Sequence, residues 1–210
     1  MPSRTSVVAG ILGVLAVLGA SFCAQAAGDV ESGRRLAYTC LGCHGIANYK
    51  NVYPTYSVPK LVGQHPEYIV AALKEYNSQE RSHGTMHAQA VSLSDQDMED
   101  IAVYFAGAVL KPGSPTQGTA PSKVTELCVA CHGKDGIGIT ADYPSLGGQH
   151  ADYLERALAE YKRGDRKNAV MPTFVATLSN HEIELIAEYY AQQTPKLETV
   201  RRRVWWFSAP

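Results

Sequence analysis

The stretch Cys40-Leu41-Gly42-Cys43-His44 recurs as Cys128-Val129-Ala130-Cys131-His132. Each copy has the Cys-x-x-Cys-His spacing by which c-type haem is attached. Two thiols three residues apart on one short turn can each bond a different vinyl group of the same porphyrin. The adjacent histidine then falls beneath the iron. The sequence therefore predicts two covalently bound haem c groups, held by Cys40 and Cys43 and by Cys128 and Cys131, with His44 and His132 as the proximal iron ligands.

Residues 1–26 have the pattern of a cleaved secretory signal peptide. Arg4 is the only charged residue in this segment, an apolar run covers residues 7–20, and Ala24-Gln25-Ala26 provides a small-x-small cleavage site. An uncleaved membrane anchor is the alternative, but the run is short for a bilayer span of roughly 20 residues. We therefore expect an exported, periplasmic protein, in agreement with haem attachment outside the cytoplasm.

Cleavage after Ala26 removes Cys23 and leaves four of the five cysteines, all of them in the two motifs. Two disulfides are an alternative for an exported chain, but they leave both histidines unexplained. Zinc is also disfavoured, because each motif supplies three ligands where structural zinc sites use four. The 19 basic and 20 acidic residues nearly balance, and nothing in the charge pattern indicates nucleic-acid binding.

An internal repeat divides the chain into two units. Gly63-Gln64-His65 recurs as Gly148-Gln149-His150, and a Pro/Gly-rich stretch without apolar periodicity separates the units. We expect a first domain at 27–110, a linker at 111–121, a second domain at 122–196 and a C-terminal tail at 197–210. Further residues match at the same offset of 85: Tyr68 with Tyr153, Leu73 with Leu158, Tyr76 with Tyr161, Arg81 with Arg166, Met86 with Met171, Leu93 with Leu178 and Tyr104 with Tyr189.

The sequence predicts that both units are helical. In the first unit, helical patterns cover 29–38 and 67–79, and Ser94 precedes a further apolar stripe as an N-cap. In the second unit, Ser179 and Glu182 form a predicted capping box before an equivalent stripe. No convincing strand pattern lies between these segments. The expected fold class is all-α, with two tandem bundles of three or four helices, each wrapped around a haem.

Met86 and Met171 are the candidates for the sixth iron ligand. They occupy equivalent positions, each about seven residues before the last helix of its unit and in what reads as a polar loop. Met98, by contrast, lies on a buried stripe and is expected in the core. His83 and His87 could compete with Met86 at the first haem. Their equivalents Asn168 and Pro172 cannot bind iron, so symmetry between the units favours methionine.

Pro59 and Pro144 are also equivalent, each four residues before the glycine of Gly-Gln-His. A proximal histidine needs an acceptor for its other ring nitrogen, which fixes the tautomer. We predict that the carbonyl groups of these prolines supply it; alternatively, the prolines only shape the loop. His65 and His150 are expected to begin the middle helix of each unit, near a haem propionate or the domain interface.

The arrangement resembles the dihaem cytochrome c4 family of bacterial class I cytochromes. Besides the haem motifs, the resemblance rests on Pro-x-Leu-x-Gly-Gln at 59–64 and 144–149, on the Tyr-x₄-Leu-x-x-Tyr helices, and on the methionines before Leu-Ser-Asp and Leu-Ser-Asn. It implies two cytochrome c domains about a pseudo-twofold axis, propionates near the interface, and electron delivery to terminal oxidases or related acceptors. The departures are a long Tyr-rich loop after the first haem, the histidines at 65 and 150, and the tail.

Three functional hypotheses follow. If methionine occupies the sixth coordination position of both irons, the protein is an electron carrier between redox partner proteins, because no position is left for a substrate. If one haem lacks its methionine, a dihaem redox enzyme becomes the alternative. A third possibility is a dedicated electron-accepting subunit of a dehydrogenase. The segment Arg201–Phe207 places three arginines beside two tryptophans and a phenylalanine, a composition that suits peripheral contact with a membrane or with a partner protein. The alternative is a disordered or poorly packed terminus.

Overall fold

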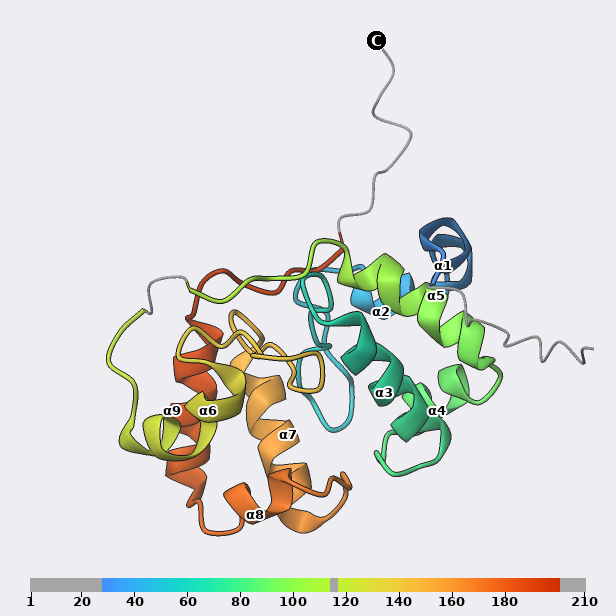
Figure 1. Ribbon diagram of the computed structural model, residues 1–210. Coiled ribbons are helices and arrows are strands. Elements are labelled where there is room, and N and C mark those ends of the chain that lie inside the picture. The colour runs from blue at the N-terminus through green and yellow to red at the C-terminus, as the bar shows by residue number, and fades with distance from the viewer. Residues whose placement is uncertain (1–27, 114–116, 201–210) are drawn as a thin grey trace, which may run out of the picture.

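The computed structural model describes residues 28–113 and 117–200, which form two groups of helices lying side by side (Figure 1). The expected signal peptide and the arginine- and tryptophan-containing end of the tail lie outside the described residues. Within those residues the structure contains helices and three isolated β-bridges but no strand ladder. The all-α fold class predicted from the sequence is confirmed. No helix among the described residues is both long and apolar enough to cross a membrane.

The first domain contains five helices whose boundaries follow from local sequence signals. Asp29 caps the first helix by accepting a hydrogen bond from the backbone of Ser32 at 2.7 Å. Pro66 begins the middle helix, where its missing N–H costs nothing. Ser94 and Asp97 form a capping box at the last helix. The helices are α1 (Val30–Leu36), α2 (Leu41–His44), α3 (Pro66–Asn77), α4 (Gly84–Ala90) and α5 (Asp95–Ala106).

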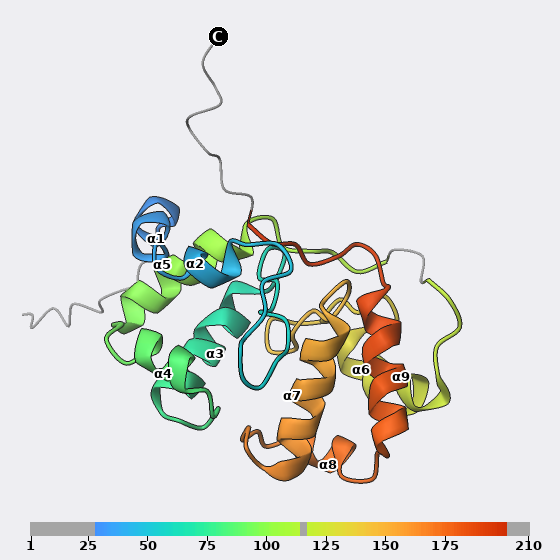
Figure 2. The same ribbon diagram turned by 180° about the vertical axis from the view of Figure 1, so that it is seen from behind.

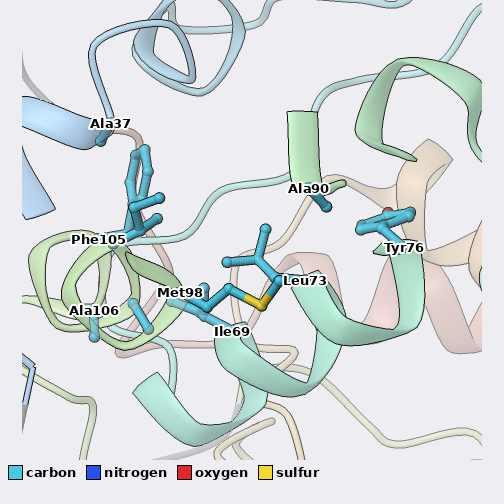
Figure 3. Packing of buried hydrophobic residues seen from close by; sticks show 10 residues of the cluster. Ala37, Ile69, Leu73, Tyr76, Ala90, Met98, Phe105 and Ala106 are labelled. Carbon is cyan, nitrogen blue, oxygen red and sulfur yellow. The ribbon is translucent and has the colours of Figure 1, made fainter. Parts of the chain in front are cut away.

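The core of the first domain lies between α3 and α5. Met98 of α5 is 2% exposed and lies beside Ile69 and Leu73 of α3 (Figure 3). This is the core role expected for Met98. Helix α1 crosses α5 at Gly33, where an added Cβ would lie only 1.9 Å from the carbonyl oxygen of Asp100. The close crossing therefore depends on glycine at this position.

The second domain repeats the middle and last helices but begins differently. In place of a counterpart of α1, it starts with a single π-helical turn, η1, directly before the second haem motif. Its last helix carries Tyr189 and Tyr190, whose hydroxyl groups donate to the carbonyl oxygens of Lys134 and Gly133 at 2.8 and 3.1 Å. The elements are η1 (Val124–Cys128), α6 (Val129–His132), α7 (Ala151–Arg163), α8 (Met171–Val175) and α9 (Asn180–Ala191).

Reciprocal hydrogen bonds join the domains at equivalent residues. The side chain of Gln149 accepts from the backbone N–H of Lys60 and donates to its carbonyl, both at 3.0 Å. Gln64 makes the same pair of bonds with the backbone of Ser145, at 2.8 and 3.0 Å. Because Gln64 is equivalent to Gln149 and Lys60 to Ser145, the two pairs are related by the pseudo-twofold symmetry that the family resemblance implies.

Two connecting segments cross between the domains. The loop at 48–58 lies against α7 (Figure 2), where Asp152 accepts from the backbone N–H and the hydroxyl of Ser57 at 3.0 and 2.9 Å. Near the C-terminus, Leu197 is fully buried and donates to Gly147 at 2.8 Å, and Glu198 exchanges two backbone bonds of 3.0 Å with Val62. The expected tail at 197–210 thus starts with residues held at the domain interface.

Candidate haem sites

The two Cys-x-x-Cys-His motifs form matching single helical turns. Helix α2 ends at His44, whose backbone N–H donates to the carbonyl of Cys40 at 2.9 Å. Helix α6 ends in the same way at His132. On such a turn, residues three and four positions apart lie on one face, so each histidine shares a face with the first cysteine of its motif. None of the four cysteines forms a disulfide.

Each motif histidine is oriented by a proline carbonyl group. Nδ1 of His44 lies 3.0 Å from the carbonyl oxygen of Pro59, and Nδ1 of His132 lies 2.9 Å from that of Pro144. A proton on Nδ1 leaves the lone pair on Nε2 available for a metal. Burial lowers the pKa of both imidazoles, although the carbonyl contacts oppose this change. Both histidines are therefore favoured in the neutral form that binds metals.

A cavity of about 430 Å³ in the second domain is bounded by both cysteines of its motif, by His132 and by Met171. These groups provide two thiols for covalent attachment and an imidazole and a thioether for iron. Apolar side chains that suit a porphyrin face form most of the remaining wall. The lining therefore fits a haem c group. The apolar lining residues include Leu146, Leu154, Leu158, Val175, Leu178 and Ile186.

The corresponding cavity of the first domain encloses about 120 Å³ and is bounded by Cys43, His44 and Met86. Its lining includes residues of both domains, since Pro144 and Tyr153 of the second domain contribute to the wall. Likewise, residues of α3 in the first domain line the larger cavity. Both candidate haem sites therefore meet the domain interface.

The methionines lie in short helices, so the expectation that they occupy loops is wrong. Met86 is the third residue of α4, and Met171 is the first residue of α8. His83 caps α4 by accepting from the backbone N–H of Met86 at 3.3 Å. Its equivalent Asn168 accepts from the backbone N–H of Met171 at 2.9 Å. In each domain a polar side chain three residues before the methionine thus accepts from its backbone N–H and holds the backbone that carries the thioether, although only His83 is the N-cap of its helix.

The structure separates the two histidines that could compete with Met86. His83 lines the same cavity as Met86. His87 turns to α3, where its Nδ1 lies 2.9 Å from the carbonyl oxygen of Tyr76, and its Nε2 faces the amide of Gln79 at 3.3 Å. Only His83 is thus placed to face the first haem. As expected, His65 begins the middle helix at the domain interface, with Nε2 3.2 Å from the carbonyl oxygen of Gly138.

Sequence reasoning assigned no role to Arg81, Arg166, Tyr68 and Tyr153, although all four recur at the repeat offset. Both arginines are almost fully buried, at 4% and 3% exposure. Arg81 lines the first cavity and Arg166 the second. The available signal was a charged residue retained at equivalent positions of two helical units, five residues before each candidate methionine.

Comparisons with known proteins agree with this geometry. Residues 30–107 match the family model "Cytochrome c", and residues 119–189 match "Cytochrome C oxidase, cbb3-type, subunit III". The chain is 35% identical over 195 residues to cytochrome c4 of Pseudomonas aeruginosa, covering 85% of this chain and 96% of that protein. The chain belongs to the cytochrome c4 family. As a family member it has two cytochrome c domains and two covalently bound haem c groups, and it is an electron-transfer protein rather than an enzyme.

A solved cytochrome c4 supports the assignment. The reduced recombinant cytochrome c4 from Pseudomonas stutzeri superimposes with a TM-score of 0.64 at 29% identity, covering 80% of this chain and 100% of that chain. A relative from Stutzerimonas stutzeri, named "Thiosulfate dehydrogenase electron acceptor", is 30% identical over 172 residues, covering 74% of this chain and 79% of that protein. Haem c supplies these cytochromes with a one-electron ferric/ferrous couple.

Proposed function

We propose that this cytochrome c4 is a periplasmic carrier that takes single electrons from respiratory-chain donors and delivers them to a terminal oxidase or similar acceptor. In this proposal, His44 and Met86 would bind the iron of the first haem, and His132 and Met171 would bind that of the second. The observation that carries it is the lining of each cavity, which contains one histidine with its Nδ1 at a carbonyl and one methionine.

The chain's own residues would favour electron transfer in two ways. Pro59 and Pro144 orient the histidine rings. The side chains of His83 and Asn168 hold the backbone N–H groups of the two methionines, so each ligand is held by a contact to the backbone as well as by its own side chain. Ligands held in the same place in both oxidation states keep the rearrangement during electron transfer small. Methionine–histidine ligation also raises the reduction potential.

The optical spectrum of the oxidised protein tests this coordination. We expect the weak far-red band of methionine bound to ferric iron at an intensity equivalent to two sites. The reduced protein should bind carbon monoxide slowly or not at all. A band equivalent to one site, or rapid carbon monoxide binding by the wild-type protein, would contradict the carrier proposal and favour the alternative of a dihaem redox enzyme.

A second candidate function is that of an electron-accepting subunit docked to a dehydrogenase. It is supported by the relative in Stutzerimonas stutzeri that is named as the electron acceptor of thiosulfate dehydrogenase. Purification of the full-length protein under mild conditions distinguishes the two functions. Stoichiometric copurification of a catalytic partner supports the subunit, whereas a protein that purifies alone and is oxidised rapidly by membranes containing terminal oxidase supports the carrier.

Localisation and domain boundaries are also part of the proposal. We infer that cleavage after residue 26 yields a periplasmic protein with domains at 27–110 and 122–196, joined by the linker at 111–121. A mature N-terminus at Ala27, measured by intact mass, is the expected result.

We further infer peripheral membrane contact through Arg201–Phe207. Truncation after Val200 keeps the interface residues Leu197 and Glu198 and should reduce the membrane-bound fraction, and equal partitioning would contradict this contact.

A further inference from the structure

Arg81 and Arg166 meet on the pseudo-twofold axis between the domains. The two residues form an antiparallel β-bridge. On either side of it, Ser82 donates to the carbonyl of Asp165 at 3.1 Å, and Lys167 donates to the carbonyl of Glu80 at 2.7 Å. Equivalent backbone positions of the two copies are thus joined directly, and both arginine side chains start from the centre of the interface.

From this bridge the two guanidinium groups extend into different cavities. Arg81 lines the first cavity and lies 4.5 Å over the ring of Tyr76. Arg166 lines the second cavity and lies 4.5 Å over the ring of Tyr161. Stacking on an aromatic face is favourable for a cation. Each arginine is thus held in the haem cavity of its own domain by a tyrosine near the end of the preceding helix.

The hydrogen bonds of the arginines, in contrast, cross the interface. Arg81 donates through Nη2 to the hydroxyl of Tyr153, which belongs to α7 of the second domain. Arg166 donates through Nη2 to the hydroxyl of Tyr68, which belongs to α3 of the first domain, at 2.7 Å. The tyrosine that orients the arginine of one cavity therefore comes from the other domain.

The protein groups around the arginines do not neutralise their charge. A buried guanidinium ion is costly unless an anion pairs with it. None of the ion pairs formed within residues 28–113 and 117–200 involves Arg81 or Arg166. Nε of Arg166 is buried and has no hydrogen-bond partner in the described part of the chain. Glu75 lines the same cavity, but its Oε2 is also buried without a hydrogen-bond partner in this part of the chain, so it does not pair with the arginine.

We propose that Arg81 and Arg166 pair with the carboxylate side chains of the first and second haem, and that Tyr153 and Tyr68 position these arginines across the interface, so that each domain sets the reduction potential of the haem in the other. Haem carries propionate groups, and a carboxylate is the planar acceptor that matches the guanidinium fork. The free Nε of Arg166 lies in the second cavity, where such an acceptor would satisfy it.

The direction of the effect follows from electrostatics. Reduction adds one negative charge to the haem, and a nearby fixed cation stabilises that state more in a buried site than in water. A tyrosine hydroxyl that orients the arginine keeps the cation close to the haem. Each tyrosine also lines the cavity of its own domain, but among the described residues its hydroxyl accepts a hydrogen bond only from the arginine of the other. Removal of this hydroxyl should therefore lower the potential of the haem in the opposite domain more than that of the haem in the same domain.

The test is a potentiometric titration of the full-length dihaem protein, with the two haems distinguished by assigned haem-methyl resonances in the NMR spectrum. We expect Tyr153→Phe to lower the reduction potential of the first haem and Tyr68→Phe to lower that of the second. Each shift should correspond to a decrease of about threefold in the equilibrium constant for reduction. Arg81→Met and Arg166→Met should change the equilibrium of their own haem by about tenfold, equivalent to about 59 mV for one electron. Arg→Lys, which keeps the charge, should restore most of this change.

Matched controls separate the proposed role from general effects. Arg34→Gln removes a charge from an exposed arginine of the first domain, and Tyr53→Phe removes a hydroxyl from a tyrosine that is 94% exposed. Neither should shift either potential. If an Arg→Met variant fails to fold, the tyrosine variants carry the test. A shift confined to the haem of the substituted tyrosine's own domain, or unchanged potentials in both tyrosine variants, would overturn the proposal, even with two intact methionine bands in the spectrum.

Discussion

The two domains share their centre and differ at their ends. Helix α3 with α5, and helix α7 with α9, occupy equivalent places, and the loops that lead into α3 and α7 make reciprocal contacts across the interface. In contrast, the first domain has α1 packed on α5, whereas the second has only η1 and relies on Tyr189 and Tyr190 to hold the loop after its haem motif. The shared parts line the haem cavities and the interface, so function constrains the centre of each repeat more tightly than its ends.

The residues that bond the backbone N–H groups of the two methionines differ between the domains. His83 and Asn168 make the same backbone contact, but only His83 carries a side chain that can bind iron. The first site therefore contains a substitute ligand within its own cavity, and the second does not. The two haems are thus expected to respond differently when the methionine is lost.

Removal of the methionines should show the largest difference between the domains. We expect Met171→Ala to open the second iron, so that the reduced protein binds carbon monoxide rapidly at one site. In Met86→Ala, His83 should replace the thioether and prevent carbon monoxide from binding at the first site, because its Nδ1 caps α4 and its Nε2 remains available. Absorption spectra with and without carbon monoxide measure both outcomes.

Two controls accompany this comparison. Met98→Leu changes a buried methionine of the core and should leave both far-red bands intact. The double variant Met86→Ala with His83→Asn places the residue of the second domain into the first and should then bind carbon monoxide as Met171→Ala does. Rapid carbon monoxide binding by Met86→Ala alone would show that His83 does not act as a substitute.

A substitution at the crossing of α1 and α5 should have a smaller effect, a loss of stability that arises only in the first domain. Gly33→Ala would place a Cβ 1.9 Å from the carbonyl oxygen of Asp100 and 2.9 Å from Cβ of Tyr104. Neither backbone can yield without separating the helices, so we expect a loss of about 3 kcal/mol in the free energy of unfolding. Denaturant unfolding measures it. Gly84→Ala is the control, because a Cβ added at Gly84 has no other atom within 4 Å. Equal stability of the two variants would contradict a tight crossing.

The contact between the loop at 48–58 and α7 should show the smallest effect. Asp152 accepts hydrogen bonds from Ser57 and forms an ion pair with Lys50 at 3.2 Å. The equivalent residue of the first domain, Glu67, is exposed. We expect Asp152→Asn to cost about 1 kcal/mol of unfolding free energy at neutral pH. Glu67→Gln should cost nothing measurable, and equal losses would argue against the loop contact.

This contact also predicts a pH dependence. Partial burial acts to raise the pKa of Asp152, but the hydrogen bonds from Ser57 and Lys50 outweigh it and lower the pKa overall. The stabilisation is therefore complete above the pKa of an unfolded aspartate, about 3.9, and is lost as the pH falls further through the folded-state pKa. The stability difference between wild type and Asp152→Asn should disappear in that acidic range.

The sequence predicted those parts of the molecule that depend on local spacing. The haem motifs, the N-cap Ser94, the capping box at Ser179 and the core position of Met98 all depend on residues close together in the chain, and the repeat is visible because the same local patterns recur. The short helices around the methionines were missed, because seven- and five-residue helices have too few positions to show a period. The roles of Arg81 and Arg166 were also missed, since their partners are contributed by the other domain.

The backbone bonds of Leu197 and Glu198 have a consequence for how the protein is assembled. Their acceptors, Gly147 and Val62, are equivalent residues of the two copies, so one short segment joins both halves near the axis that relates them. Because the acceptors belong to different halves, these bonds can form only when both halves have folded and docked. The segment then limits how far the two halves can separate.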